Sequence, residues 1–179
     1  KCRPPPLLSC VRAQAIIFKL LGAKWWCFMA DFDSNRFASK KQDYATPWDL
    51  FNVLNEEFHF TLDVCADEQN RKVDKYFSIK DDGLSQDWKG VCWMNPPYKD
   101  MKKWIIKAYE ESIKHDSIVV CLIPARTNTN WWHDYCMKGE IRFIRGRPKF
   151  DGCKHGLPQP LAVVIFGKGY TNNCKSIVI

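Results

Sequence analysis

Residues 91–98 read Val-Cys-Trp-Met-Asn-Pro-Pro-Tyr, and this stretch decides the predicted fold. Its first four residues form an apolar run typical of a buried strand. The two prolines that follow cannot donate to a sheet ladder, so the strand must end there. An amide, a rigid turn and an aromatic ring are therefore expected at the carboxyl end of a strand. In open α/β sheets this is the edge that binds ligands.

The four residues after that strand resemble a motif of amino-methyltransferases, and this resemblance implies methyl transfer to an amino group. An exocyclic NH2 of a base is a weak nucleophile because its lone pair is delocalised into the ring. We expect the Asn95 side-chain oxygen and the Pro96 carbonyl, which is held by ring-restricted dihedrals, to accept hydrogen bonds from it. The ring of Tyr98 would stack on an extruded base, a contact worth roughly 1–3 kcal/mol. The alternative is an ordinary proline-rich loop after a buried strand.

Asn-Pro-Pro-Tyr at a strand end resembles the catalytic motif of S-adenosylmethionine-dependent amino-methyltransferases. The methyl donor in these enzymes is a sulfonium cation, so the reaction needs neither a metal nor a covalent nucleophile. Orientation and electrostatics would carry it. We therefore expect S-adenosyl-L-methionine as the cofactor and no metal.

Charge is unevenly spread along the 179 residues, which are enough for one domain. The formal net charge is +7, and residues 126–179 hold nine Lys or Arg against three acids. The stretch 29–125 is acidic by comparison. This asymmetry predicts one face for a polyanion and another for a cationic cofactor. Solvated surface charge is the alternative explanation.

Residues 1–28 contain five basic residues and no acid, and their apolar stretch is too short to span a membrane. We interpret 1–28 as an extension outside the domain and 29–179 as a single methyltransferase domain that starts at Met29. The alternative is a basic, apolar helix that docks on the domain. The nine cysteines form no Cys-x-x-Cys pair, which disfavours zinc, and their odd number favours a reducing cytoplasm.

Helical and strand patterns alternate along the rest of the chain. Thr46 is a predicted N-cap and Pro47 the first helical residue, followed by apolar residues at helical spacing over 50–58. Strands are predicted over 60–66, 76–79, 91–94, 117–123, 141–144 and 161–166, and helices over 101–114 and 131–137. One of Trp131 and Trp132 is expected in the core. The pattern predicts an α/β fold with a mostly parallel sheet and a C-terminal antiparallel hairpin.

A series of short motifs makes the resemblance specific. In chain order these are 46–47, 62–66, 82–84, 87–88, 95–98, 124–127, 131–133 and 146–150. Together they resemble the phage-type DNA N6-adenine methyltransferase (Dam-like) family over roughly residues 38–168. The resemblance implies a Rossmann-like methyltransferase fold. It also implies a monomer that acts on double-stranded DNA in a bacterial host cytoplasm, with phage or prophage origin and a place in restriction-modification.

The resemblance also implies roles for individual residues. Thr46 and Pro47 would line the methionine end of the cofactor, with Asp63 and Ala66 beneath it, while Asp82 and Asp87 would face its ribose and adenine. Asn95, Pro96, Pro97 and Tyr98 would hold the target adenine. The chain departs from methyltransferases at large in two respects. The turn after Asp63 has no glycine, and only about thirty residues separate Ala66 from Asn95.

Basic residues of the last third are candidates for contacts with DNA. Arg145, Arg147 and Lys149 alternate along a predicted strand and its turn, which would place them on one face towards phosphates. Arg126, in the matched segment 124–127, is assigned to the same surface. The competing interpretation places Arg147 in a structural turn, paired with an internal acid.

Two other functions remain open on these residues. The same fold could methylate RNA or a protein glutamine, because the residues that select the base cannot be identified. A protein of another class, a non-catalytic DNA-binding module, could retain the fold without binding the cofactor.

Overall fold

The computed structural model describes residues 45–150 and 159–178. The predicted extension over 1–28 and the predicted start at Met29 lie outside the described residues. The helices are α2 (Trp48–Phe58), α3 (Met101–Lys114) and α4 (Asn130–Asp134), with 3-10 turns η2 (Tyr98–Asp100) and η3 (Cys136–Lys138). The strands are β1 (Leu62–Asp63), β2 (Val91–Met94), β3 (Ile118–Pro124), β4 (Glu140–Arg145), β5 (Leu161–Phe166) and β6 (Asn173–Val178).

These strands form one sheet in the order β1-β2-β3-β5-β4-β6. Strands β1, β2 and β3 pair in parallel, β5 is antiparallel to both of its neighbours, and β6 is parallel to β4. All the described strands except β5 therefore point the same way. The predicted α/β class with a mostly parallel sheet is confirmed, and so is the antiparallel pairing of β4 with β5.

Strand β6 is an addition that the sequence patterns did not predict. It lies at the sheet edge beside β4, and most of its residues are exposed. A strand with one neighbour and two wet faces needs no apolar run or alternation, so its sequence carries little signal. The antiparallel pair is consequently followed by a further strand and is not the last element of the chain.

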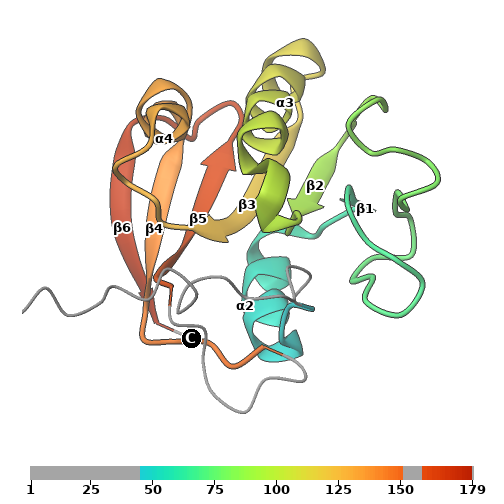
Figure 1. Cartoon of the computed structure of the whole chain (residues 1–179), viewed down its shortest axis with the longest axis horizontal. Coiled ribbons are helices and arrows are strands. Elements are labelled where there is room, and N and C mark those ends of the chain that lie inside the picture. Colours follow the sequence, from blue (N-terminus) through green and yellow to red (C-terminus); the bar gives the residue numbers. More distant parts are fainter. Residues whose placement is uncertain (1–44, 151–158, 179) are drawn as a thin grey trace, which may run out of the picture. The chain divides into compact units, whose positions relative to one another are not determined.

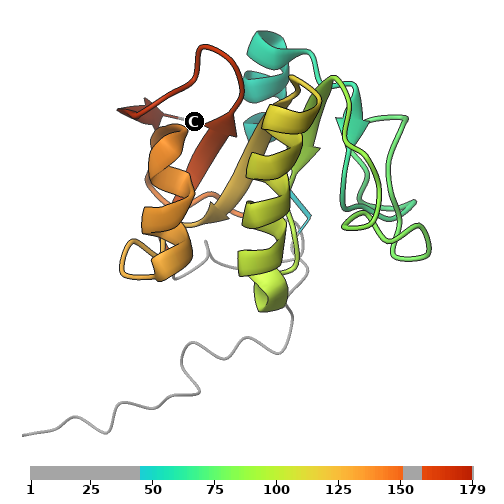
Figure 2. The same cartoon turned by 90° about the horizontal axis from the view of Figure 1, so that it is seen from above.

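Helices cover both faces of the sheet. Figures 1 and 2 show α3 and α4 on one face and α2 on the other. Alternate residues of β3 point to opposite faces of the sheet. Cys121 packs in the core on the α3 side, and Val120 packs in the core on the α2 side. Burial on both faces explains why β3 is a continuous apolar run.

Two predicted strands before β2 are largely wrong. Only Leu62 and Asp63 of the stretch 60–66 form a strand, and Tyr76 contributes a single bridge to Asp63. Beyond Asp63 the chain turns away from the sheet, and residues 64–90 follow an irregular path beside β1 (Figure 1). An apolar run shows that a segment is buried, but not how many of its residues form a regular ladder; here backbone hydrogen bonds to residues 75–77 and to β2 extend only a little beyond Leu62 and Asp63.

The start of α2 also differs from its prediction. The helix begins at Trp48, Pro47 occupies the cap position, and no side chain caps the helix. The Thr46 hydroxyl instead accepts a hydrogen bond from the Asn95 side chain. Trp131 and Trp132 are both buried, against the expectation that one of them would be, because α4 packs both rings under β4 and α3. Within the described part of the chain, none of the helices is long and apolar enough to traverse a bilayer.

Candidate active site at the carboxyl ends of β1 and β2

A cavity of about 540 Å³ opens where β1 and β2 end. Its walls come from the start of α2, the end of β1, the irregular segment after β1 and the turn after β2. Seven of the residues predicted for catalysis or cofactor binding line it: Thr46, Asp63, Ala66, Asp82, Asn95, Pro96 and Pro97. Parallel pairing of β1 with β2 brings Asp63 and Asn95 to the same sheet edge, although 32 positions separate them.

Asp63 is a buried carboxylate in the wall of this cavity, with 3% of its surface exposed. Its two oxygens accept hydrogen bonds from the backbone N–H groups of Lys72, at 3.1 Å, and Cys65, at 3.4 Å. Burial raises the pKa of Asp63 to about 6, and the two hydrogen bonds only partly offset that rise. A carboxylate with this pKa is ionised at neutral pH and favours a cation beside it.

The Asn95 side chain is held by Thr46, in the segment just before α2. Its side-chain Nδ2 donates to Thr46 Oγ1 at 3.0 Å, and Thr46 is 2% exposed. Pro96 and Pro97 follow and lead into η2. Its first residue, Tyr98, is half-buried and packs against the core on both the α3 side and the α2 side of the sheet. Tyr98 and Pro47 are not among the residues that line the cavity.

Several lining residues were missed by the sequence analysis, among them Lys72, Phe77, Gly83 and Trp104. Gly83 has a packing reason to be glycine, because a Cβ there would clash with the Val64 carbonyl oxygen. Its backbone can therefore lie close against the chain that follows β1. The Lys72 ammonium lies 4.0 Å from the centre of the Trp48 ring and links the irregular segment to α2.

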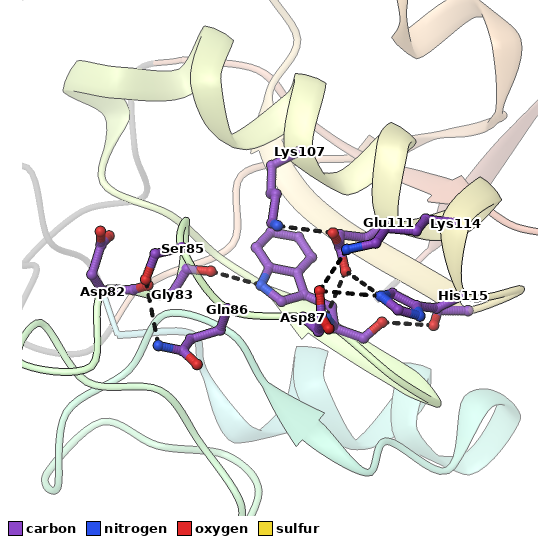
Figure 3. Close-up of polar contacts among 11 residues, drawn as sticks. Asp82, Gly83, Ser85, Gln86, Asp87, Lys107, Glu111, Lys114 and His115 are labelled. Atoms are coloured by element: carbon purple, nitrogen blue, oxygen red, sulfur yellow. Dashed lines mark hydrogen bonds and ion pairs between the residues drawn. The ribbon is translucent and has the colours of Figure 1, made fainter.

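Asp87 is not brought to the cavity, in contrast to Asp82. Figure 3 shows Asp87 with the residues at the end of α3, where its Oδ1 lies 2.7 Å from Lys114 Nζ and 3.2 Å from His115 Nε2. Hydrogen bonds from Lys114 and then His115 lower the pKa of Asp87 to about 2. Asp87 comes before the amino end of β2, whereas Asn95 follows the carboxyl end of the same strand. The two residues therefore lie at opposite ends of β2. We therefore leave Asp87 out of the candidate site.

The same corner brings together three side chains of metal-ligating types, Asp87, Glu111 and His115, with ligand atoms within 4.8 Å of one another. Lys107 is bonded to Glu111 at 2.8 Å and Lys114 to Asp87 (Figure 3). Glu111 also accepts the backbone N–H of Trp88. Lys107 and Lys114 already neutralise Glu111 and Asp87. We therefore infer that this cluster holds Trp88 between α3 and β2 and does not bind a metal ion.

The basic candidates lie at the same sheet edge as Asn95. Strand β4 has the direction of β3, so Arg145 at the end of β4 and Arg126 after β3 both extend from the carboxyl edge. Arg126, Arg145, Arg147 and Lys149 are all exposed. The predicted alternation of Arg145, Arg147 and Lys149 along a strand and its turn is wrong beyond Arg145. Strand β4 ends at that residue, and Gly146 turns the chain with a φ of 94°.

Arg142 pairs with one buried acid, Glu140, and one exposed acid, Glu57. It is 8% exposed, and its guanidinium contacts Glu57 at 2.5 and 2.7 Å and Glu140 at 2.7 Å. The alternative named Arg147 as the structural arginine, and the described residues show such pairing at Arg142 instead. Arg147 lies in the turn after β4 with an exposed side chain.

Comparison with known proteins identifies the family of the chain. The family model for DNA N-6-adenine-methyltransferase (Dam) matches residues 33–169. The chain belongs to this family. The resemblance to Dam-like proteins drawn from the motifs is therefore confirmed.

Dam relatives from two phages show the extent of the similarity. A DNA N-6-adenine-methyltransferase of Haemophilus phage HP1 is 37% identical over 116 residues, which are 62% of this chain and 66% of that protein. One of Escherichia phage T1 is 30% identical over 144 residues, 76% of this chain and 60% of that protein. The chain therefore spans somewhat less than two thirds of the length of these relatives. A putative methyltransferase, YfdM, of Escherichia coli is 35% identical over 63 residues, 31% of this chain and 69% of that protein.

Proposed function

We propose that this protein transfers a methyl group from S-adenosyl-L-methionine to the N6 amino group of an adenine in double-stranded DNA. The observation that carries the proposal is the placement of Asn95 and Asp63 on one cavity at the ends of adjacent parallel strands. An amide-bearing turn and a buried carboxylate are what the two halves of this reaction require. Membership of the Dam family supports the same reaction.

The parallel run β1-β2-β3 with a cavity at its carboxyl edge supports a Rossmann-like methyltransferase arrangement. In this arrangement Asp63, Ala66 and Asp82 would surround the cofactor, and Thr46 would close its methionine end through its backbone, because its hydroxyl is engaged by Asn95. The carboxylate of Asp63 would favour its positive charge.

Catalysis would rest on orientation and electrostatics. The Asn95 oxygen and the Pro96 carbonyl would accept hydrogen bonds from the adenine N6 hydrogens. Those bonds would localise the nitrogen lone pair for attack on the sulfonium methyl group. The C–S bond would break with its electrons on the departing thioether, and the N6 nitrogen would then release one proton to water. Tyr98 would stack on the extruded base from the start of η2, and Pro47 would buttress Thr46.

One labelling experiment tests the proposal against its alternatives. The protein is incubated with S-adenosylmethionine carrying a labelled methyl group and, in parallel, with unmethylated duplex DNA, RNA and a protein extract. We expect label in DNA, recovered as N6-methyladenine after hydrolysis. Label in RNA or in protein glutamine would identify the same fold with another substrate. DNA binding without cofactor binding would identify a non-catalytic module.

We also propose that the protein acts in a reducing cytoplasm and is of phage or prophage origin. The described cysteines Cys65, Cys92, Cys121, Cys136 and Cys174 are all free thiols, which supports a reducing cytoplasm. Phage relatives support a phage or prophage origin.

Cofactor affinity should depend on the ionisation of Asp63. The cofactor has a net positive charge at neutral pH. It should therefore bind more tightly when the Asp63 side chain is an ionised carboxylate than when it is a neutral acid. With the pKa of Asp63 at about 6, affinity should be flat above pH 6 and fall below it. The fall should approach about tenfold in Kd per pH unit, because a proton must then leave on binding. Calorimetric titrations between pH 5 and 7.5 measure this.

The matched variant for this measurement is Asp63→Asn, which should bind more weakly but without the bend at pH 6. A parent protein whose Kd is constant from pH 5 to 7.5 would show that Asp63 does not face the cofactor's charge.

Binding of DNA should depend on the exposed arginines at the end of β4. Replacing Arg145 and Arg147 together by alanine should weaken binding. Each lost phosphate contact should also reduce the slope of log affinity against log salt by about 0.9. Affinity for the cofactor should not change. Fluorescence anisotropy with duplex DNA at several salt concentrations measures the slope.

The control pair is Lys89→Ala with Lys168→Ala. Both lysines are exposed, near the opposite edge of the sheet from Asn95. An equal loss of slope in the control pair would mean that the charge effect is general, and that DNA does not lie along the carboxyl edge.

A further inference from the structure

The hydrogen bond between Asn95 and Thr46 joins two motifs that are 49 positions apart. It runs from the Asn95 side-chain Nδ2 to the Thr46 hydroxyl at 3.0 Å. Both residues line the cavity at the carboxyl ends of β1 and β2. The contact therefore lies where the proposed reaction takes place, and it acts on the side chain to which the reaction is assigned.

An asparagine amide has two chemically opposite ends. The oxygen only accepts hydrogen bonds and the NH2 only donates them. An adenine amino group also donates, so it is stabilised by the oxygen and opposed by the NH2. The terminal torsion of asparagine is broad and close to two-fold, so the side chain does not choose its orientation by itself. The hydrogen-bond partner of the amide makes that choice. In the structure Thr46 Oγ1, a group that can donate or accept, accepts from the NH2 end and so turns the oxygen end away from itself.

Thr46 is well placed to be this partner because its position is set by packing. It is 2% exposed, and Pro47 follows it with a φ of −59° at the cap of α2. The first turn of α2 then packs on β2, since the rings of Phe51 and Trp93 lie 5.5 Å apart in an edge contact. Trp93 is two residues before Asn95. The helix and the strand that carry the two partners are thus held together directly beside the hydrogen bond.

We propose that Thr46 is a positioning residue for the reaction. By accepting from Asn95 Nδ2, its hydroxyl holds the amide so that the oxygen is the end presented to the amino group of the substrate. This role rests on the proposed function and deepens it. It differs from a contact with the cofactor, because it acts on the rate of transfer and not on cofactor affinity.

The test compares Thr46→Val, which has nearly the same shape but no hydroxyl, with Thr46→Ser, which retains the hydroxyl. At saturating cofactor and DNA, the single-turnover rate of Thr46→Val should fall by roughly 10- to 100-fold, as expected for a misplaced catalytic group. Thr46→Ser should stay within about threefold of the parent, and the Kd for S-adenosylmethionine should change by less than about threefold in both. Thr171→Val, at an exposed threonine away from the cavity, is the control for the substitution itself.

A second measurement follows the hydrogen bond without activity. The side-chain NH2 signals of Asn95 in ¹⁵N–¹H spectra are identified by their absence in Asn95→Asp. Their exchange with solvent should be slow in the parent and in Thr46→Ser, and fast in Thr46→Val. If Thr46→Val does not fold, as judged by a thermal melt, Thr46→Ala replaces it, because it removes the hydroxyl without adding a methyl group against the Asn95 amide.

Three results would overturn the proposal. One is a rate within twofold of the parent in the variant without the hydroxyl. Another is a loss of rate that excess S-adenosylmethionine restores, which would make Thr46 a cofactor contact. The third is unchanged exchange of the Asn95 NH2. A parent protein that labels no DNA at all would overturn the proposed function, and the catalytic role of Thr46 with it, while the exchange rates would still decide whether the contact exists.

Discussion

Replacing Asn95 by alanine should lower the rate of methyl transfer to DNA by about 10²–10³-fold, the usual effect of losing one directed polar group at a reacting centre. The variant loses the acceptor proposed for the adenine amino group. Asp63 and the other cavity walls that would hold the cofactor are untouched. The Kd for S-adenosylmethionine should therefore stay close to that of the parent. Single-turnover rates at saturating cofactor, together with calorimetric titrations, measure both quantities.

The matched control is Asn52→Ala, an exposed asparagine on α2 that does not line the cavity. It should transfer methyl groups at the parent's rate. Near-parental turnover in Asn95→Ala would remove Asn95 from the mechanism. A large rise in the cofactor Kd with little change in rate would move it to the cofactor site.

Replacing Arg142 by methionine should destabilise the protein by about 3 kcal/mol, at the lower end of what breaking a buried ion pair costs. Glu140 is 4% exposed and would keep its negative charge without its main partner. Lys175 still contacts Glu140 at 3.0 Å, which limits the loss. Glu57 is 44% exposed at its side chain, so water can solvate it. Urea unfolding followed by circular dichroism gives the free energy.

Two comparisons separate this effect from the loss of any arginine. Arg145→Met, at an exposed site on the same strand, should change stability by no more than about 0.5 kcal/mol. Adding Glu140→Gln to Arg142→Met should recover part of the loss, because no unpaired buried charge remains. If the single variant lost less than about 1 kcal/mol, the ion cluster would not hold α2 to β4 and β6.

Elements with strong local signals were predictable. The limits of β2, α3 and β5 agree with their predictions, because each is an apolar run or an amphipathic stripe with clear ends. The exposed edge strand β6 and the short extent of β1 were not, since pairing depends on neighbours that periodicity does not describe.

The candidate site divides in the same way. Asn95, Pro96 and Pro97 could be assigned from their own sequence, since the prolines end the strand and the residue types define the chemistry. Asp82 and Asp87 look alike along the chain, yet the first lines the cavity and the second pairs with Lys114. Arg142 and Arg145 look alike too, yet the first is buried between acids and the second is exposed.

By itself, then, the sequence determined the α/β class, the strand that carries Asn95 and membership of the Dam family, because local residue types and their order suffice for these. Only the tertiary structure decided which charged groups face the cavity, that the Gly83 backbone lies against the Val64 carbonyl, and that Thr46 holds Asn95. Each of these depends on contacts between residues distant in the chain. The packing of α2, β1, β2 and the segment between β1 and β2 creates those contacts.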